Sequence, residues 1–92
     1  PSKIYSIFAS GRPVLASVDS GTEIDRILNI SGGGIAVLPD DFNAFFDKLE
    51  NLIENLELRE MMGNKARIWL EKWYSPESIA RSYLDLIRQL NL

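Results

Sequence analysis

The sequence contains neither cysteine nor histidine among its 92 residues. Without cysteine, no disulfide can stabilise the fold and no thiolate can bind a metal. Without histidine, the commonest general base and the commonest zinc ligand are also missing. Metal sites built on thiolate or imidazole ligands are therefore excluded in this chain.

Strong charge of either sign and long apolar runs are also missing. Ten basic residues, scattered along the chain, face thirteen acidic ones, for a formal net charge of −3. This distribution does not provide the basic face that nucleic acids require. No apolar run approaches the roughly 20 residues that span a bilayer, and no signal peptide opens the chain. These features predict a soluble, cytoplasmic protein that is not transmembrane.

Hydrophobic periodicity predicts the element order α-β-α-β-α-α-α. Residues 2–10 have helical spacing, and the runs at 13–18 and 35–38 lack the polar alternation of a half-exposed strand. A short helix lies between them. Three further stripes follow, at 42–56, 58–73 and 79–90. The fold class is therefore α/β, with two parallel strands in a βαβ unit and a helical carboxy-terminal part.

Turn and cap residues mark the ends of these elements. Ser20 and Glu23 have the spacing of a capping box, Asp40 or Asp41 can cap the third helix, and Ser75 precedes a proline suited to a first helical position. The cluster at 32–34 is read as helix termination and a tight turn, because a phosphate loop would have to follow a strand. Gly63 is a candidate break within its helix.

A cluster of aromatic residues lies near the end of the fourth helical stripe. Trp69, Trp73 and Tyr74 stand beside Arg67 and Lys72, which suits a membrane-surface face. Both tryptophans also continue the apolar stripe of their helix, so we expect them to pack in the core.

The candidate binding site is expected at the carboxyl ends of the two strands, where open α/β sheets bind ligands. Pro1, Ser2 and Lys3 combine free amides at a helix start with a hydroxyl and an ammonium group, which suits a phosphate. The alternative is that Ser2 caps the helix and Lys3 is simply solvated. The loop at 19–23 offers amides and hydroxyls to a sugar or phosphate, or else forms an ordinary helix cap.

The same segments resemble, in order and along the whole chain, those of retaining family-4 glycosyltransferases, in particular enzymes of capsular or colanic-acid-type polysaccharide synthesis. PSK at 1–3 and ASGRPVLA at 9–16 resemble the family's PSK…A-x-G-x-P-V-x-A, and GTEI at 21–24 is similar to its next loop. GIAVLPDD at 34–41 resembles G-x-x-V-x-P-x-D, LREMMGNKAR at 58–67 resembles L-R-x-x-M-G-x-x-A-R, and Tyr74-Ser75 resembles the turn that follows.

The resemblance implies a GT-B fold, in which two Rossmann-like domains flank the active site. Residues 1–92 would be the carboxy-terminal part of the donor-binding domain, with an αβαβ segment at 1–41 and three helices at 42–92. Such an enzyme transfers a sugar from a nucleotide diphosphate donor to a glycan or lipid-linked acceptor with retention, generally without a metal. The resemblance therefore implies no metal and no cofactor, since the nucleotide-sugar is a substrate. The missing amino-terminal domain would be required, so this chain alone is expected to be inactive and to hold no catalytic residue.

The resemblance also implies roles for individual residues. Ser2 and Lys3 match the segment that contacts the donor diphosphate, and the loop of Ser20, Gly21, Thr22 and Glu23 matches the donor side of the site. The family carries two glutamates eight positions apart, of which the second holds the nucleotide ribose. Ser6 occupies that second position here, and a serine hydroxyl bonds a ribose more weakly than a carboxylate does.

Two alternative functions stay open at this point. One is a sugar-nucleotide epimerase of similar fold. Another is a helical protein-interaction module that binds through the stripe at 42–56. Because two strands leave open sheet edges, the chain is also expected to self-associate as a homodimer, whichever function it has. The full-length enzyme would be cytoplasmic or peripheral to the inner membrane.

Overall fold

The computed structural model describes residues 2–90 and has the predicted order of seven elements. Two strands, β1 (Val14–Ser17) and β2 (Gly34–Val37), pair in parallel with Val14 opposite Gly34. The five helices are α1 (Ser2–Ala9), α2 (Glu23–Ser31), α3 (Phe42–Glu54), α4 (Leu56–Trp73) and α5 (Pro76–Leu90). The α/β class and the parallel pairing are therefore confirmed.

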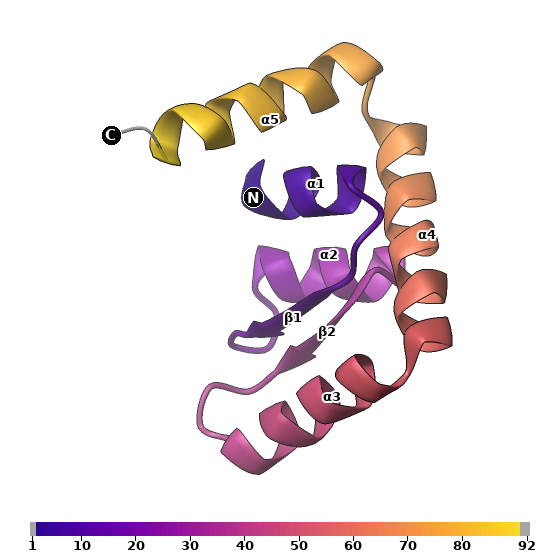
Figure 1. Cartoon of the computed structure of the whole chain (residues 1–92). Coiled ribbons are helices and arrows are strands. Elements are labelled where there is room, and N and C mark those ends of the chain that lie inside the picture. The colour runs from indigo at the N-terminus through magenta and orange to yellow at the C-terminus, as the bar shows by residue number, and fades with distance from the viewer. Residues whose placement is uncertain (1, 91–92) are drawn as a thin grey trace.

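The helices surround the strand pair on two sides. Helices α1 and α2 lie on one side and α3 on the other, while the long α4 runs from α3 towards α1 (Figure 1). Helix α5 turns back and packs on α1. This return partly covers the last apolar stripe, so Ile79 and Leu86 are half-buried whereas Leu90 stays exposed.

The core lies between α1, α2 and α4. Its buried side chains are Ile4, Phe8, Ile27, Leu28, Ala66 and Leu70. Phe8 is 0 % exposed, and its ring meets the ring of Trp69 edge-on, with 6.1 Å between centroids. Burying apolar area of this kind is the main favourable term in folding, so this cluster holds the strands against α4.

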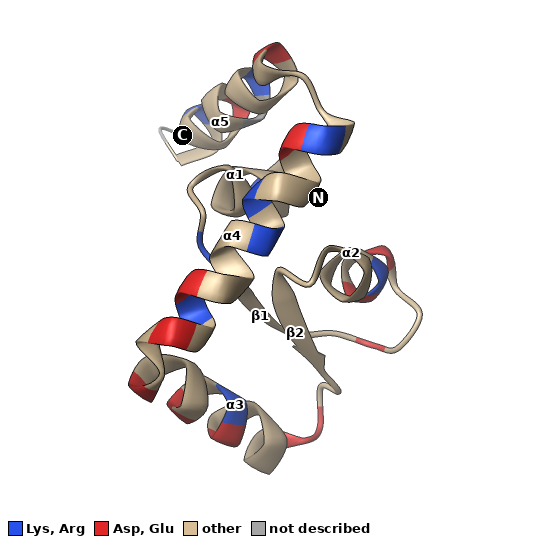
Figure 2. Ribbon diagram, turned by 90° about the vertical axis from the view of Figure 1, so that its right-hand side faces the viewer, with Lys and Arg blue, Asp and Glu red and all other residues tan. Residues whose placement is uncertain are grey.

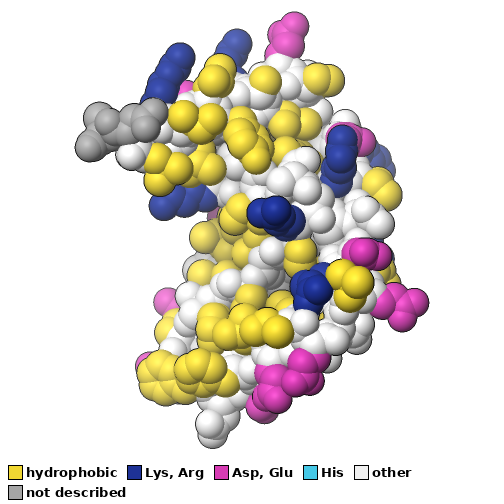
Figure 3. Space-filling model, viewed as in Figure 1, with side chains coloured by type: hydrophobic (Ala, Val, Ile, Leu, Met, Phe, Trp, Pro, Cys, Tyr) yellow, Lys and Arg dark blue, Asp and Glu magenta, His cyan; other side chains and the backbone are white. Residues whose placement is uncertain are grey.

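The expected stripe of α3 is only partly covered. Leu52 is buried, but Phe42, Phe46 and Ile53 are more than half exposed. The apolar side chains over this end of the molecule and over α5 are visible in Figure 3. On the other side of α3 and at the start of α4, the acidic residues form a solvated surface (Figure 2).

The expected break at Gly63 is wrong, because α4 continues through it from Leu56 to Trp73. A Cβ atom at Gly63 would lie 1.9 Å from the carbonyl oxygen of Gly11. The glycine is therefore needed where α4 crosses the turn between α1 and β1, and it does not interrupt the helix.

The glycine cluster after α2 acts as predicted. Gly32 ends the helix in the left-handed region at φ 69°, and its amide donates to the carbonyl of Leu28 at 3.2 Å. Gly34 then pairs with Val14, whose carbonyl oxygen would be 2.4 Å from any added Cβ. The cluster is a turn and a close packing point between two elements.

Candidate functional site

The amino end of α1 and the carboxyl ends of β1 and β2 lie on the same side of the molecule (left in Figure 1). Lys3 is exposed in the first turn of α1, and Ser2 beside it is half-buried. Pro1, the other residue of this predicted site, lies outside the described residues. The start of α1, with its first amides and the exposed Lys3, therefore faces the same side as the strand ends, and such a helix start suits an anion.

Ser6 is buried beneath this surface. It is 2 % exposed, and its hydroxyl donates to the carbonyl of Ser2 at 3.0 Å. A contact between this hydroxyl and a ribose therefore requires the first turn of α1 to adjust, because the side chain is directed into its own helix.

The loop between β1 and α2 is held by its own hydrogen bonds. Thr22 is the N-cap, since its hydroxyl oxygen accepts from the amide of Asp25 at 3.2 Å. The Asp25 carboxylate in turn accepts from the amide of Gly21 at 2.8 Å. Gly21 has φ 82°, a conformation that favours glycine. The predicted capping box of Ser20 and Glu23 is therefore wrong by two residues.

This correction leaves two predicted loop residues available. Ser20 and Glu23 are both exposed, and the N-cap bond in this loop is made by Thr22 rather than by Ser20. The cap fails at Ser20 because Gly21 takes a positive φ, which places the helix start after Thr22. A loop fixed at Gly21 and Thr22 can present both exposed side chains at a defined position.

An acidic recess lies at the same end of the strands. Its volume is about 400 Å³, and its lining consists of Asp19, Leu38, Pro39, Asp40 and Asp41. Asp41 is already the N-cap of α3 and accepts from the amide of Ala44 at 3.0 Å. Among residues 2–90, no group of three acidic side chains is arranged to hold a metal ion. Carboxylates repel a diphosphate but accept hydrogen bonds from hydroxyl groups.

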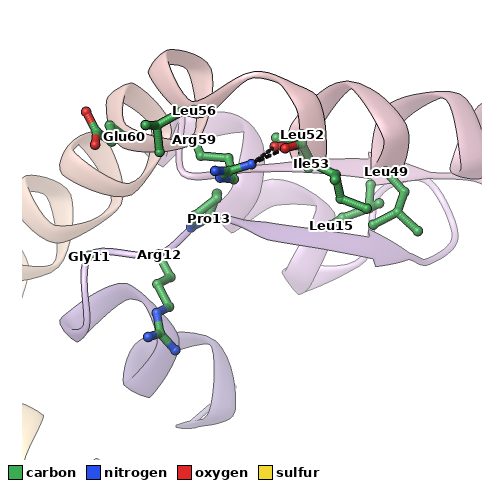
Figure 4. A pocket seen from close by; sticks show the side chains of 10 residues that line it. All are labelled: Gly11, Arg12, Pro13, Leu15, Leu49, Leu52, Ile53, Leu56, Arg59 and Glu60. Atoms are coloured by element: carbon green, nitrogen blue, oxygen red, sulfur yellow. Dashed lines mark hydrogen bonds between the residues drawn. The ribbon is translucent and has the colours of Figure 1, made fainter.

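An apolar cavity of about 530 Å³ separates β1 from the turn between α3 and α4 (Figure 4). Leu15, Leu49, Leu52 and Leu56 are among its lining residues. The Arg59 guanidinium caps the end of α3 by donating to the carbonyl of Leu52 at 2.6 Å and to that of Ile53. This cation is therefore used inside the fold, and the cavity has little polar lining with which to orient a ligand.

A third cavity, of about 640 Å³, is the most aromatic. We call it the aromatic pocket; it is lined by Tyr5 of α1, Arg26 and Ile30 of α2, Trp69, Lys72 and Trp73 of α4, and Tyr74. Trp69 is half-buried as expected, but Trp73 is 63 % exposed, so the expectation that both tryptophans are core residues is wrong for Trp73. The rings of Tyr5 and Phe8 of α1 pack against Trp69.

The hydroxyl groups of Tyr5 and Tyr74 bond to each other at 2.8 Å, across 69 positions of sequence. Burial, followed by the hydrogen bond and the charge of Tyr74, raises the pKa of Tyr5 to about 12 from 10.0. In the unfolded chain the Tyr5 hydroxyl loses its proton near the ordinary pKa of 10.0, at a lower pH than in the folded chain. The associated stability is therefore present below about pH 10 and is lost as the pH rises towards about 12.

Replacing Tyr74 by phenylalanine is expected to lower the pKa of Tyr5. The value should stay above 10.0, because burial is its largest cause and remains in the variant. The ultraviolet absorbance of phenolate during a pH titration measures the change, with Tyr83→Phe as the matched control and circular dichroism to confirm folding at each pH. An unchanged high-pH titration step in Tyr74→Phe would contradict the assignment.

The sequence correctly predicted two parallel strands whose carboxyl ends lie at one edge. It did not predict the acidic recess or the aromatic pocket. A signal existed for the recess, since Asp19 follows one strand and Asp40 follows the other. No comparable signal joins Tyr5 to Tyr74, because only the packing of α1 against α4 brings them together.

Comparisons with known proteins do not show a family for this chain. Among the helices that the structure describes, none is long and apolar enough to cross a membrane. No protein-family model, curated protein or solved structure matches the chain.

Proposed function

We propose that this chain forms the donor-binding side of a retaining, sugar-nucleotide-dependent glycosyltransferase with two Rossmann-like domains. The observation that supports this best is that the amino end of α1, where Ser2 and Lys3 stand in the sequence, faces the same side of the molecule as the carboxyl ends of β1 and β2. The ordered resemblance of the whole sequence to retaining family-4 glycosyltransferases supports it independently. Catalytic residues and the acceptor site would belong to another domain.

The proposed site divides its chemistry between two neighbouring groups of residues. The amides at the start of α1 and the ammonium of Lys3 would meet the donor diphosphate, where the helix dipole also favours negative charge. The exposed Ser20 and Glu23 would contact the hydroxyl groups of the transferred sugar. Holding the leaving diphosphate with fixed amides and a cation stabilises the charge that develops during transfer.

The acidic recess limits where the diphosphate can lie. Asp19 and Asp40 would repel phosphate oxygens but would accept hydrogen bonds from sugar hydroxyls. The diphosphate is therefore assigned to the start of α1 and not to the strand ends themselves. This arrangement requires no metal ion in the present chain.

Replacing Lys3 by alanine is expected to weaken binding of a nucleoside diphosphate by about 1–3 kcal/mol, because a charge-assisted contact is lost. Calorimetric titration with UDP, ADP and GDP measures the effect and identifies the preferred base. Lys48→Ala, which removes another exposed lysine, on α3, is the matched control and should bind as the unmodified chain does.

If the unmodified chain and Lys3→Ala bind the nucleoside diphosphate with equal affinity, Lys3 is a solvated surface residue that does not contact the diphosphate. If none of the three nucleotides binds, the exposed apolar side chains of α3 favour the second candidate function, a helical protein-interaction module. Phe42, Phe46 and Ile53 then provide the contact surface, since exposed apolar patches mark association sites.

A further inference from the structure

The aromatic pocket has a floor made of rings that support one another. The ring centroids of Tyr5 and Tyr74 are 4.7 Å apart, and Trp69 lies 6.4 Å from Tyr5 and 6.2 Å from Tyr74. Trp69 is further held by its edge-on contact with the buried Phe8. Such a floor is fixed before any ligand arrives, which lowers the entropic cost of binding.

One wall of the pocket remains open to a ligand. Trp73 and Ile30 are both more than half exposed, although both line the cavity. Exposed large apolar side chains beside a fixed aromatic floor offer stacking area to a planar ring. The volume of about 640 Å³ lies within the range of small-molecule sites, about 300–1,000 Å³.

The charged lining of the pocket has a single sign. Arg26 and Lys72 contribute two cations, and no carboxylate lines the cavity among the described residues. The ion pairs of this part of the chain, Arg67 with Glu71 and Arg88 with Asp85, do not involve either cation. The Lys72 ammonium lies 5.4 Å from the centre of the Trp73 ring. The Glu23 carboxylate lies near enough to act electrostatically on Tyr5, but it is not part of the lining, whose charged groups are both cations.

We propose that the aromatic pocket binds a small aromatic anion, a planar ring that carries a phosphate or similar acidic group. The ring would stack on Trp73 over the floor of Tyr5, Trp69 and Tyr74, and the anionic group would meet Arg26 and Lys72. The proposal is independent of the nucleotide site, because the two sites share no residue. A hollowed surface fits a small molecule better than it fits a flat bilayer, so an anionic membrane is the competing outcome to be tested.

Phenyl phosphate is a suitable probe, and the chain contains its own reporters. Both tryptophans of the sequence, Trp69 and Trp73, line the pocket, so their fluorescence responds to a ligand there. We expect saturable quenching with a dissociation constant of about 1 mM, a reasonable affinity for a ligand of this size. Phenol lacks the charge and inorganic phosphate lacks the ring, so each should bind at least about fivefold more weakly.

Three variants test the two halves of the site. Arg26→Gln and Lys72→Gln are each expected to weaken phenyl phosphate binding about 3- to 10-fold, since each removes a charge-assisted contact. Trp73→Leu removes the stacking wall but keeps Trp69 as the reporter. Lys48→Gln on α3 is the control and should leave binding unchanged. The melting curve of each variant shows whether the fold is intact.

Several results would overturn the proposal. Binding of phenyl phosphate that is unchanged in the double variant Arg26→Gln/Lys72→Gln would place the probe elsewhere. The absence of binding at several millimolar would exclude the site. A fluorescence change with phosphatidylglycerol vesicles, without one for phenyl phosphate, would assign the surface to an anionic membrane. The affinity for UDP separates the two proposals. If it falls with Lys3→Ala but not with Lys72→Gln, UDP binds at the start of α1, and a failure of the aromatic pocket leaves the proposed function intact.

Discussion

Replacing Phe8 by alanine is expected to lower the free energy of unfolding by about 3–5 kcal/mol, the range measured for fully buried phenylalanines. Phe8 is 0 % exposed and contacts Trp69 edge-on. Gly33 and Ala66 pack so closely beside it that a Cβ on Gly33 would be 2.9 Å from the Phe8 ring and 2.5 Å from the Ala66 Cβ. Because these neighbours are small, they cannot fill the cavity that the substitution leaves.

Urea denaturation followed by circular dichroism measures this loss. Phe46→Ala is the matched control, because it removes the same side chain from a position that is 62 % exposed, and it should cost less than about 1 kcal/mol. A native domain is stable by about 5–15 kcal/mol. Phe8→Ala is therefore expected to unfold at a measurably lower urea concentration, or to be unfolded without urea if the chain lies at the low end of this range. Similar losses in both variants would show that Phe8 is not in the core.

Replacing Gly63 by alanine is expected to destabilise the chain by about 1–3 kcal/mol, although alanine is the better helix former by about 1 kcal/mol. The added Cβ would lie 1.9 Å from the carbonyl oxygen of Gly11 and 2.7 Å from its carbon. Both are backbone atoms, so α4 must move away from the turn between α1 and β1. This movement would loosen the contacts of Ala66 and Leu70 in the core.

The opposite signs of the two effects make this substitution informative. Propensity alone predicts a gain in stability, whereas the close approach predicts a loss. Asn64→Ala, at the adjacent exposed position of α4, isolates the propensity effect and should be neutral or slightly stabilising. Thermal melts of the unmodified chain, Gly63→Ala and Asn64→Ala show which of the two effects is larger. A higher melting temperature for Gly63→Ala would mean that α4 does not press on Gly11.

Much of the fold was predictable because its signals are local. The stripe of Ile4 and Phe8 marks α1, the unalternated runs mark β1 and β2, and Asp41 and Ser75 bond the amides of Ala44 and Ser78 at helix starts. Each signal needs only the geometry of one helix or strand. The same reasoning identified the open end of the strand pair as the candidate site, with Ser2 and Lys3 on that side.

The rest depended on distances between elements that lie far apart in the sequence. Spacing alone does not distinguish Trp69 from Trp73, and only the packing of α1, whose Tyr5 and Phe8 rings lie against Trp69, decides which one is covered. Gly63 looked like a helix breaker until α4 was seen to cross Gly11. The bond between Tyr5 and Tyr74, and the pocket around it, form only when α1 packs against the end of α4. Periodicity therefore determined the elements and their order, whereas packing decided which residues meet, because contact across elements is not encoded in any one local repeat.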